Sequence, residues 1–408
     1  MRIRINTGTV TYFILYGALL LIYSCGFTFL QTYQLYALLA SSAILVFMFV
    51  YTNKMRIKRK NLVILLFAIY VIIGMLAWGV EKDKLTLMLY ITALLTSVLY
   101  VVNDISNKPT EMFFRIIQYV ALFEAITIFF SVVIPGLMPQ KFGFLYRQLV
   151  IDTMNKDLRR GIYSGFIGEK AAAAYLLNLG LAYTLSFLNV NNRIDKKKLL
   201  LSVVLFLAIL FTGKRMLLLT AVFMFLASLL AGRSLKNKIR AIGIIGVGII
   251  ILVLFVKYVP AASITFQRFM LTESYDTMNG REDMWISALK IFENNKIIGC
   301  GYGSYQSVSG SIYNGHNSYL QLLAETGILG CAILSIIFVT TIIYAIRNLH
   351  KNKSTMNYLA LNLLILTFLY AYTGNVFHTS YQLITFFVAI AITNYSQEKN
   401  VECKKVEQ

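Results

Sequence analysis

Apolar runs follow one another along the whole chain, separated by short charged or turn-forming stretches. A helix needs about 20 apolar residues to cross the hydrocarbon core of a membrane, and several runs reach that length. The pattern therefore predicts an all-α, polytopic membrane protein with about 12 transmembrane helices in a single integrated membrane domain. The predicted spans are residues 10–30, 33–51, 62–80, 85–102, 113–134, 166–188, 199–212, 216–231, 241–258, 328–346, 358–372 and 381–394.

Two polar segments, residues 135–165 and 259–327, are longer than a connection between two helices requires. Loops of more than about 15 residues usually carry a function or lack fixed structure. We predict that residues 1–258 contain the first nine transmembrane helices and an outer loop at 135–165. Residues 259–327 are predicted to form a large extracytoplasmic loop that carries the candidate site. Residues 328–408 are predicted to hold the last three helices and a cytoplasmic tail.

The large loop is predicted to be partly helical. The segment from Ser287 to Asn294 has a helical apolar pattern, and a second helix is predicted to begin within the segment from Asn317 to Ala324. Ahead of this loop, the polar break Gly213-Lys214-Arg215 predicts either a tight outer turn or a dip within a re-entrant pair. The apolar face predicted for the first loop helix consists of Trp285, Ala288, Leu289 and Phe292.

Composition and charge agree with a membrane protein and indicate its orientation. Hydrophobic residues make up 58% of the chain and charged residues 14%, whereas soluble domains carry about 25% charged residues. The formal net charge of +20 comes from basic residues that gather in alternate short connections, such as 53–61 and 193–198. Because cytoplasmic loops retain positive charge during insertion, both termini are predicted to be cytoplasmic and both long polar segments to face outward. This placement indicates contact with membrane lipids and gives no support for nucleic acid as a partner.

The residue types that hold cofactors are sparse and scattered. The four cysteines, Cys25, Cys300, Cys331 and Cys403, have no paired spacing, so neither a disulfide framework nor a zinc site is predicted. The sequence also contains no Asp-x-Asp motif, no cluster of histidines and cysteines, and no phosphate-binding glycine loop of the nucleotidase type. We therefore predict no metal and no other cofactor.

Charged and glycine-containing motifs gather in the second half of the chain. Gly280-Arg281 is followed by Trp285, then by a glycine-rich turn from Gly299 to Gly303, then by Gly315-His316-Asn317-Ser318. Glu325 and Gly327 close the series. The arrangement resembles the O-antigen ligase and polymerase family, whose members share a glycine-arginine pair, a tryptophan, a glycine-rich turn and a histidine-asparagine pair that leads to glutamate and glycine. The earlier Thr212-Gly213-Lys214-Arg215 matches the arginine that this family carries at the outer end of a helix.

The resemblance implies a glycosyltransferase that uses a polyprenyl-pyrophosphate-linked oligosaccharide as its donor. It would act at the outer face of the bacterial cytoplasmic membrane. The preferred hypothesis is a polymerase of polysaccharide repeat units, which makes capsule, exopolysaccharide or O-antigen. In this reaction the growing glycan leaves its carrier and joins a sugar hydroxyl of another lipid-linked unit. A flippase and a chain-length regulator of the same pathway are candidate partners.

The chemistry of that reaction suggests roles for three residues. The departing pyrophosphate needs fixed positive charge, and the planar guanidinium of arginine donates paired hydrogen bonds to phosphate oxygens, so Arg215 and Arg281 are the candidate ligands. The attacking hydroxyl must lose a proton, and histidine is the usual base near neutral pH, so His316 is the candidate catalytic base. The alternative roles are a surface ion pair for Arg281, a side chain that snorkels at a helix end for Arg215, and a helix cap for His316.

Several further residues are candidates for supporting roles. Lys214, Arg159 and Arg160 add positive charge that either guides the anionic donor or contacts lipid headgroups. Asn317 adjoins the base, and Glu325 lies nine residues after His316, which on one continuous helix would place the two about half a turn out of phase. Either the helix breaks near Gly327 with His316 before its first turn, or Glu325 has another task, and a structural role is favoured.

Two isolated residues have open roles. Glu124 lies inside a predicted span and is expected to face the bundle interior and to pair with a donor that the sequence does not identify. His378 lies in the outer segment 374–380, where a role within the loop is favoured over contact with substrate. The glycines from Gly299 to Gly303 predict a turn with positive φ rather than a phosphate cradle.

Two other functions remain open at this point. A ligase would perform the same transfer onto a different acceptor, such as a lipopolysaccharide core, a protein or a wall polymer, and the sequence does not separate it from a polymerase. A membrane transporter is the alternative from another class, because twelve helices are ordinary for transporters. Transporters often carry charges near the membrane midplane, whereas here the polar motifs converge on one outer loop, which favours an enzyme.

Overall fold

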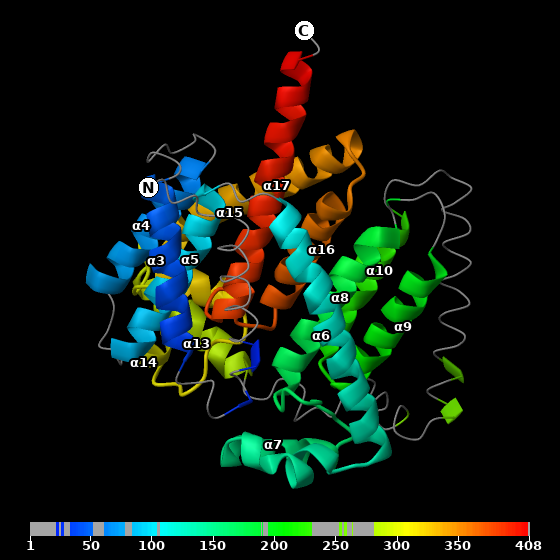
Figure 1. The fold of residues 1–408 in the computed structure, drawn as a ribbon. Helices are drawn as coiled ribbons and strands as arrows, with labels where there is room; N and C mark the ends of the chain where they lie inside the picture. Colours follow the sequence, from blue (N-terminus) through cyan, green and yellow to red (C-terminus); the bar gives the residue numbers. More distant parts are fainter. Residues whose placement is uncertain are drawn as a thin grey trace, which may run out of the picture.

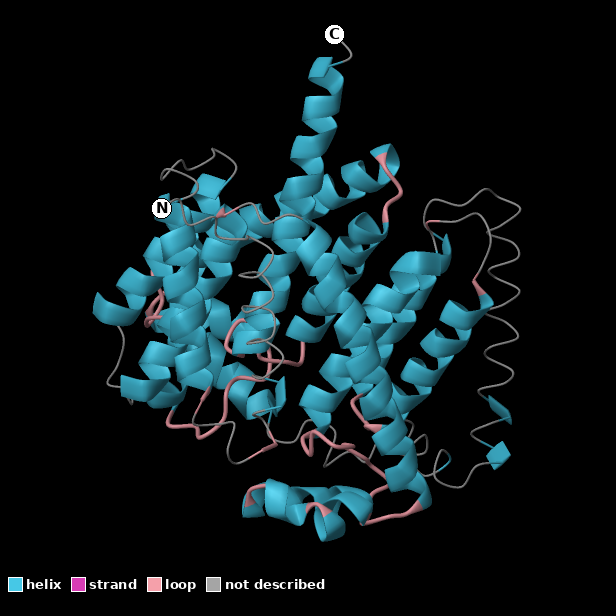
Figure 2. Ribbon diagram, viewed as in Figure 1, coloured by secondary structure: helices cyan, strands magenta, loops and turns pink. Residues whose placement is uncertain are grey.

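The computed structural model describes residues 33–51, 61–77, 84–103, 107–188, 195–230 and 281–406, with a few short pieces between them. In these parts the chain is helical and forms no sheet (Figures 1 and 2). The longer helices are α3 (Gln34–Tyr51), α4 (Leu62–Ala77), α5 (Lys84–Val102), α6 (Asn107–Val133), α7 (Gln148–Leu158), α8 (Lys170–Leu188), α9 (Lys196–Phe211), α10 (Arg215–Leu230), α13 (Arg281–Asn294), α15 (Ser318–Lys351), α16 (Thr355–Ala371) and α17 (Ser380–Val406). The shorter ones are η2 (Leu137–Lys141), η3 (Gly143–Leu145) and α14 (Tyr305–Ser309).

The all-helical class predicted from the sequence is confirmed for the described residues. Each predicted span in these parts coincides with a helix, whereas the predicted spans 10–30 and 241–258 lie almost entirely outside the described residues. Three described helices are long and apolar enough to cross a membrane: Lys108–Val133, Lys170–Leu188 and the helix from Ser318 to Lys351. Five shorter apolar helices accompany them. The total of about 12 spans remains a prediction.

Helix α8 lies at the centre of one half of the bundle, in contact with α6, α9, α10 and α16. Nearly all of its residues are buried, because its run of alanines and Gly180 lets neighbouring helices approach closely. A Cβ atom added to Gly180 would lie 2.4 Å from the Cβ of Ala121 on α6. Small residues of this kind are the usual means by which helices pack in a membrane.

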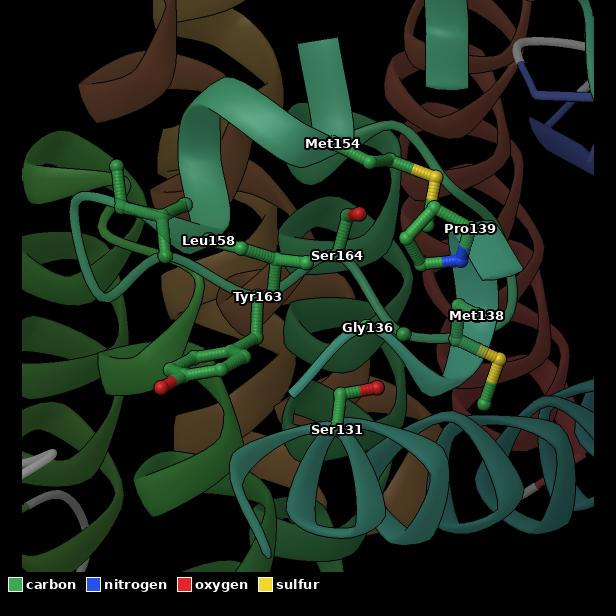
Figure 3. A pocket seen from close by; sticks show the side chains of 10 residues that line it. Ser131, Gly136, Met138, Pro139, Met154, Leu158, Tyr163 and Ser164 are labelled. Carbon is green, nitrogen blue, oxygen red and sulfur yellow. The ribbon is translucent and has the colours of Figure 1, made fainter. Parts of the chain in front are cut away.

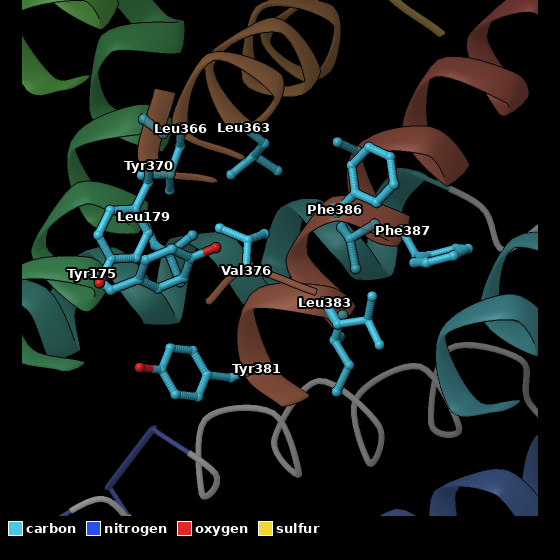
Figure 4. Packing of buried hydrophobic residues seen from close by; sticks show 14 of the residues in the cluster. Tyr175, Leu179, Leu363, Leu366, Tyr370, Val376, Tyr381, Leu383, Phe386 and Phe387 are labelled. Carbon is cyan, nitrogen blue, oxygen red and sulfur yellow. The ribbon is translucent and has the colours of Figure 1, made fainter. Parts of the chain in front are cut away.

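Aromatic side chains join α8 to the last two helices (Figure 4). The ring of Tyr175 on α8 lies 5.3 Å from that of Tyr381 on α17 and 6.0 Å from that of Tyr370 on α16, centroid to centroid. Phe386 and Phe387 continue this buried cluster along α17. Because α16 and α17 are held to α8 in this way, the turn between them has a fixed position relative to the core.

The segment predicted as the outer loop 135–165 contains a helix of its own. Helix α7 lies across the end of the bundle opposite to the C-terminal end of α17 (Figure 1). Val150 and Met154 face inward from α7, while Leu149 is exposed. Between α7 and the end of α6 lies a small pocket lined by apolar side chains and by the hydroxyls of Ser131 and Ser164, with no charged side chain in its lining (Figure 3).

The segment from 281 to 327 is largely ordered in two helices and a loop that lead into α15. Helix α13 confirms the helix predicted around Ser287–Asn294, and its predicted apolar face is right at Ala288 but wrong at Leu289. Ala288 and Ile291 are the buried residues of α13, whereas Leu289 is 43% exposed. The buried face is shifted because Met284 and Ala288 pack against Tyr305 and Ala324 of α14 and α15.

Helix α15 is divided by a sharp kink at Gly327, whose φ of 61° and ψ of −168° are outside the helical region. The break leaves helix carbonyl and amide groups without partners, and the loop at 296–301 supplies them. The amides of Cys300 and Gly301 donate to the carbonyls of Ala324 and Glu325, at 3.1 and 2.9 Å. On the other side of the kink, Ile328 N donates to Lys296 O at 2.9 Å. The kink therefore separates a nine-residue first piece, residues 318–326, from the apolar remainder of α15.

Gly327→Ala is expected to destabilise the protein strongly. The φ and ψ of Gly327 lie in a region that is essentially restricted to glycine, which costs another residue about 1–3 kcal/mol. An added Cβ atom would also lie 2.3 Å from the carbonyl oxygen of Ile297. The measurement is the thermal unfolding midpoint of the purified protein in detergent.

Gly310→Ala is the matched control for this prediction. Gly310 also has a positive φ, of 68°, but nothing lies within 4 Å of an added Cβ atom. The control should therefore lose only the conformational part, about 1 kcal/mol. Equal unfolding midpoints for the two variants would show that the contacts at Gly327 do not restrict the kink.

Candidate active site

The turn between α9 and α10 brings the first two candidate cations to one end of the bundle. Helix α9 ends at Phe211 and α10 begins at Arg215, with Gly213 at a φ of 65° between them. Gly213 packs against Ile162, and Tyr163 N donates to Phe211 O at 3.0 Å. The polar break is therefore a tight turn between the two helices.

Arg281 approaches the same turn from α13, of which it is the first residue. Its side chain is partly buried, and Tyr370 and Arg215 are the charged or ionisable groups that act on it most strongly. Burial lowers the pKa of the Arg281 guanidinium from its ordinary value, and the positive charge of Arg215 lowers it further. Such crowding of like charges is unfavourable unless an anion binds between them.

His316 lies in the loop that leads into α15, just before the first turn of that helix. Asn317 is the N-cap residue, and its side-chain oxygen accepts hydrogen bonds from Tyr319 N and Leu320 N at 3.1 and 3.2 Å. His316 has a φ of 48°, and it is the only non-glycine residue with positive φ in the described part of the chain. This helix start was predicted from the sequence, and Asn317 acts in it as a cap.

The imidazole of His316 is close to Arg281 and Lys214. Burial lowers the pKa of His316 to about 4, and the positive charges of Arg281 and Lys214 contribute in that order. Burial also lowers the pKa of Lys214. The structure therefore brings together Lys214, Arg215, Arg281 and His316, which the sequence places in three separate segments.

Two carboxylates act on the cations of this cluster, because Glu169 and Asp157 both raise the pKa of Lys214. Among the described residues, neither Lys214 nor Arg281 forms an ion pair with a carboxylate. Lys170, which adds to the positive potential at Lys214, is paired with Asp157 at 2.7 Å. No described residue forms a hydrogen bond with the His316 ring, so its nitrogens are available to a ligand. Fixed cations next to a neutral imidazole suit a reaction in which an anionic group is held while a hydroxyl group loses a proton.

Glu325 has a structural role in the described geometry. Its buried carboxylate accepts hydrogen bonds from Gly303 N at 2.6 Å and from Tyr305 N at 3.1 Å. It also accepts from Gln321 Nε2 at 3.1 Å, and His378 Nε2 lies 2.6 Å from Oε2. The carboxylate therefore ties α14, α15 and the turn after α16 together.

The glycine-rich turn wraps around this carboxylate. Gly299, Gly301 and Gly303 all have positive φ, between 73° and 96°, which confirms the turn predicted from the sequence. A Cβ atom at Gly299 would lie 2.3 Å from the carbonyl carbon of Glu325. Successive backbone amides in such a turn form a concave anion site. Here the anion is the side chain of Glu325, so the turn is not available to phosphate.

Other predicted residues lie apart from the cluster. Arg159 and Arg160 are exposed at the end of α7, and their side chains contact no described partner. Glu124 is fully buried, as predicted, and its Oε1 accepts from Ile167 N at 3.2 Å. Among the described residues its other oxygen has no partner. His378 is buried beneath Tyr302, whose ring stacks on it at 4.7 Å.

The sequence did not identify the residues that hold the loop of His316, which we call the site loop. Gln321 fastens the loop by accepting from Gly315 N at 2.9 Å and by donating to Asn314 Oδ1 at 3.3 Å. Gln321 lies four residues before Glu325, so the two share one helix face, and this spacing could have predicted their contact from the sequence. Asn375 accepts from His316 N at 3.1 Å, and no sequence spacing points to that contact.

Comparison with known proteins gave one family match. Residues 200–335 match the family model described as O-antigen ligase, which supports the assignment of the chain to the O-antigen ligase and polymerase family. The matched region includes the turn at Lys214, helix α13 and the loop of His316, and it ends before the turn between α16 and α17. A search of curated proteins gave no match.

Removal of one cation is expected to raise the pKa of His316. In Lys214→Met the imidazolium form no longer faces that positive charge, so the ring should protonate at higher pH than in the wild type. Inorganic pyrophosphate should have the same effect on the wild-type protein, because its negative charge offsets the cations. The measurement is NMR titration of selectively labelled histidines, of which the chain has three.

Lys351→Met, at the other end of α15, is the control and should leave the titration of His316 unchanged. If Lys214→Met and pyrophosphate both leave it unchanged, then the cluster does not act on His316 as inferred.

Proposed function

We propose that this protein, assigned to the O-antigen ligase and polymerase family, is a glycosyltransferase that polymerises lipid-linked glycans. Its donor would be an oligosaccharide on polyprenyl pyrophosphate, and its acceptor a sugar hydroxyl of another lipid-linked unit. The observation that carries the proposal is that Lys214 and Arg281 act on the neutral ring of His316, with Arg215 next to Arg281. The cations can bind the pyrophosphate of the donor, and the imidazole can accept the proton of the acceptor hydroxyl.

The proposed step is a displacement at the anomeric carbon of the donor glycan. His316 takes the proton of the acceptor hydroxyl, and the acceptor oxygen forms the new bond to the anomeric carbon. The bond between that carbon and the pyrophosphate oxygen breaks, and polyprenyl pyrophosphate leaves with the electron pair. Negative charge grows on the leaving oxygen, where fixed cations in a site with little water lower the barrier most.

The lowered pKa of His316 is consistent with a base. A pKa of about 4 keeps the ring unprotonated at neutral pH, which a group that accepts a proton requires. The same neighbours that lower the pKa would be partly neutralised by a bound pyrophosphate. The ring would therefore become a stronger base when the donor is present, because its two cationic neighbours then face an anion.

The location of the cluster agrees with a reaction at a membrane surface. Lys214 and Arg281 lie at helix ends beside apolar helices, where a lipid-anchored pyrophosphate would present its charge. The distribution of basic connections predicts that this side is the outer face of the bacterial cytoplasmic membrane. Capsule, exopolysaccharide and O-antigen are the products that such a polymerase would make, with a flippase and a chain-length regulator as candidate partners.

A ligase is the second candidate, because the matched family model is described as O-antigen ligase. The chemistry at the anomeric carbon would be the same, and only the acceptor would differ. The cluster would then serve a hydroxyl on a lipopolysaccharide core, a protein or a wall polymer.

The test is the length of surface polysaccharide on gels, in cells that lack the gene and carry variants at matched membrane levels. His316→Ala removes the base and is expected to slow transfer by about 100-fold or more. Arg281→Ala removes a ligand of the leaving group and is expected to slow it by roughly 100-fold. Both variants should leave single repeat units attached to the surface.

His350→Ala and Arg347→Ala are matched controls at the far end of α15 and should give full-length polymer. Normal polymer that remains on its lipid carrier in the gene deletion would identify a ligase. Full-length attached polymer from both site variants would contradict the assignment of the site.

A further inference from the structure

The turn between α16 and α17 lies directly on the loop that carries His316. Asn375 Oδ1 accepts a hydrogen bond from His316 N at 3.1 Å. Next to it, the hydroxyl of Ser318 donates to Gly374 O at 2.7 Å and accepts from Val376 N at 2.7 Å. Three hydrogen bonds therefore join two segments that are almost 60 residues apart in the chain.

The contact falls on the one described non-glycine residue with a positive φ. The left-handed conformation of His316, at a φ of 48°, costs roughly 1–2 kcal/mol and needs a specific partner to persist. The side chain of Asn375 satisfies the amide of His316 in that conformation. The direction of the imidazole follows from the backbone that bears it.

We propose that Asn375 is a positioning residue, which holds the backbone of His316 in its left-handed conformation and thereby directs the imidazole toward the cation cluster. Its effect on glycan transfer rests on the proposed function, whereas the contact itself does not. Asn375 lies outside residues 200–335, so the family match makes no statement about it.

The rest of the turn supports Asn375. His378 N donates to Asn375 O at 2.9 Å, and the His378 ring is fixed by Glu325 and by the stacked ring of Tyr302. The hydroxyl of Tyr302 in turn donates to Phe377 O. The carboxylate of Glu325 is thus linked through the turn to the amide of His316, although Glu325 lies within α15 and His316 in the loop before it.

Two variants, Asn375→Ala and Asn375→Asp, distinguish an effect on the position of His316 from an effect on the stability of the whole protein. The alanine variant removes the acceptor, and a base misplaced by about 1 Å loses roughly 10- to 100-fold in kcat with KM unchanged. The aspartate variant keeps an oxygen that accepts from His316 N and adds a negative charge next to His316, which opposes the effect of Arg281 and Lys214 on the ring. Compared with Asn375→Ala, it should restore kcat at high pH. It should also move the acid limb of the pH profile to higher pH than in the wild type, because the pKa of His316 is raised.

Asn362→Ala is the matched control. Asn362 is a buried asparagine of α16 that donates to Ala182 O at 3.0 Å and does not contact the loop of His316. This variant loses a packing hydrogen bond, so its thermal stability should fall while its pH profile stays that of the wild type. Rates are measured on full-length protein in detergent, with lipid-linked glycan extracted from cells that lack the gene.

A second measurement does not depend on glycan transfer. In histidine-labelled protein, Asn375→Asp should raise the pKa of His316, and Lys351→Met should not. An unchanged acid limb and an unchanged His316 titration in Asn375→Asp would overturn the proposal, as would a wild-type kcat for folded Asn375→Ala. If wild-type protein transfers no glycan while Asn375→Asp still raises the pKa of His316, the positioning contact stands and the proposed function fails.

Discussion

The arrangement of the site depends on the buried carboxylate of Glu325. A carboxylate withdrawn from water must be compensated by hydrogen bonds, and four groups from three segments supply them. The glycines of the turn at 299–303 have the positive φ values that aim its amides at the carboxylate, while His378 reaches it from the turn after α16. Because the four donors come from three segments, loss of the carboxylate would release all three segments at once.

The kink at Gly327 allows one helix to meet two requirements. The first piece of α15 follows the loop of His316 and must present polar groups, whereas residues beyond the kink carry exposed apolar side chains such as Ile336, Val339 and Ile343, which suit lipid. Backbone groups freed by the break would be costly near a membrane. The loop at 296–301 and the hydroxyl of Tyr70, which donates to Thr326 O at 2.7 Å, supply their partners.

The sequence predicted the positions of the described helices well, but it predicted poorly which side chains contact one another between helices. Apolar runs define the spans because a membrane helix requires them, and the helix start at Asn317 and the glycine turn have local signals. The apolar face predicted for α13 was wrong at Leu289, because the packing of α13 is decided by α14 and α15 rather than by its own pattern. Asn375 was missed for the same reason, since its contact depends on how α16 and α17 pack against α8. The motifs identified the charged residues of the cluster as candidates, but the sequence did not predict that Lys214 acts on His316, because that depends on the fold.

The placement of acids explains how the cluster keeps its cations available. Glu325 is the acid nearest to the site loop in sequence, and its charge is engaged by backbone amides and by His378 rather than by an arginine. Asp157 is likewise engaged by Lys170. Glu169, whose charge acts on Lys214, accepts a hydrogen bond from Ala172 N at 2.6 Å. If any of these acids were free to form an ion pair with Lys214 or Arg281, that pair would compete with an anionic substrate and would raise the pKa of His316. Burial of the acids against other partners therefore preserves both the positive potential and the neutral imidazole.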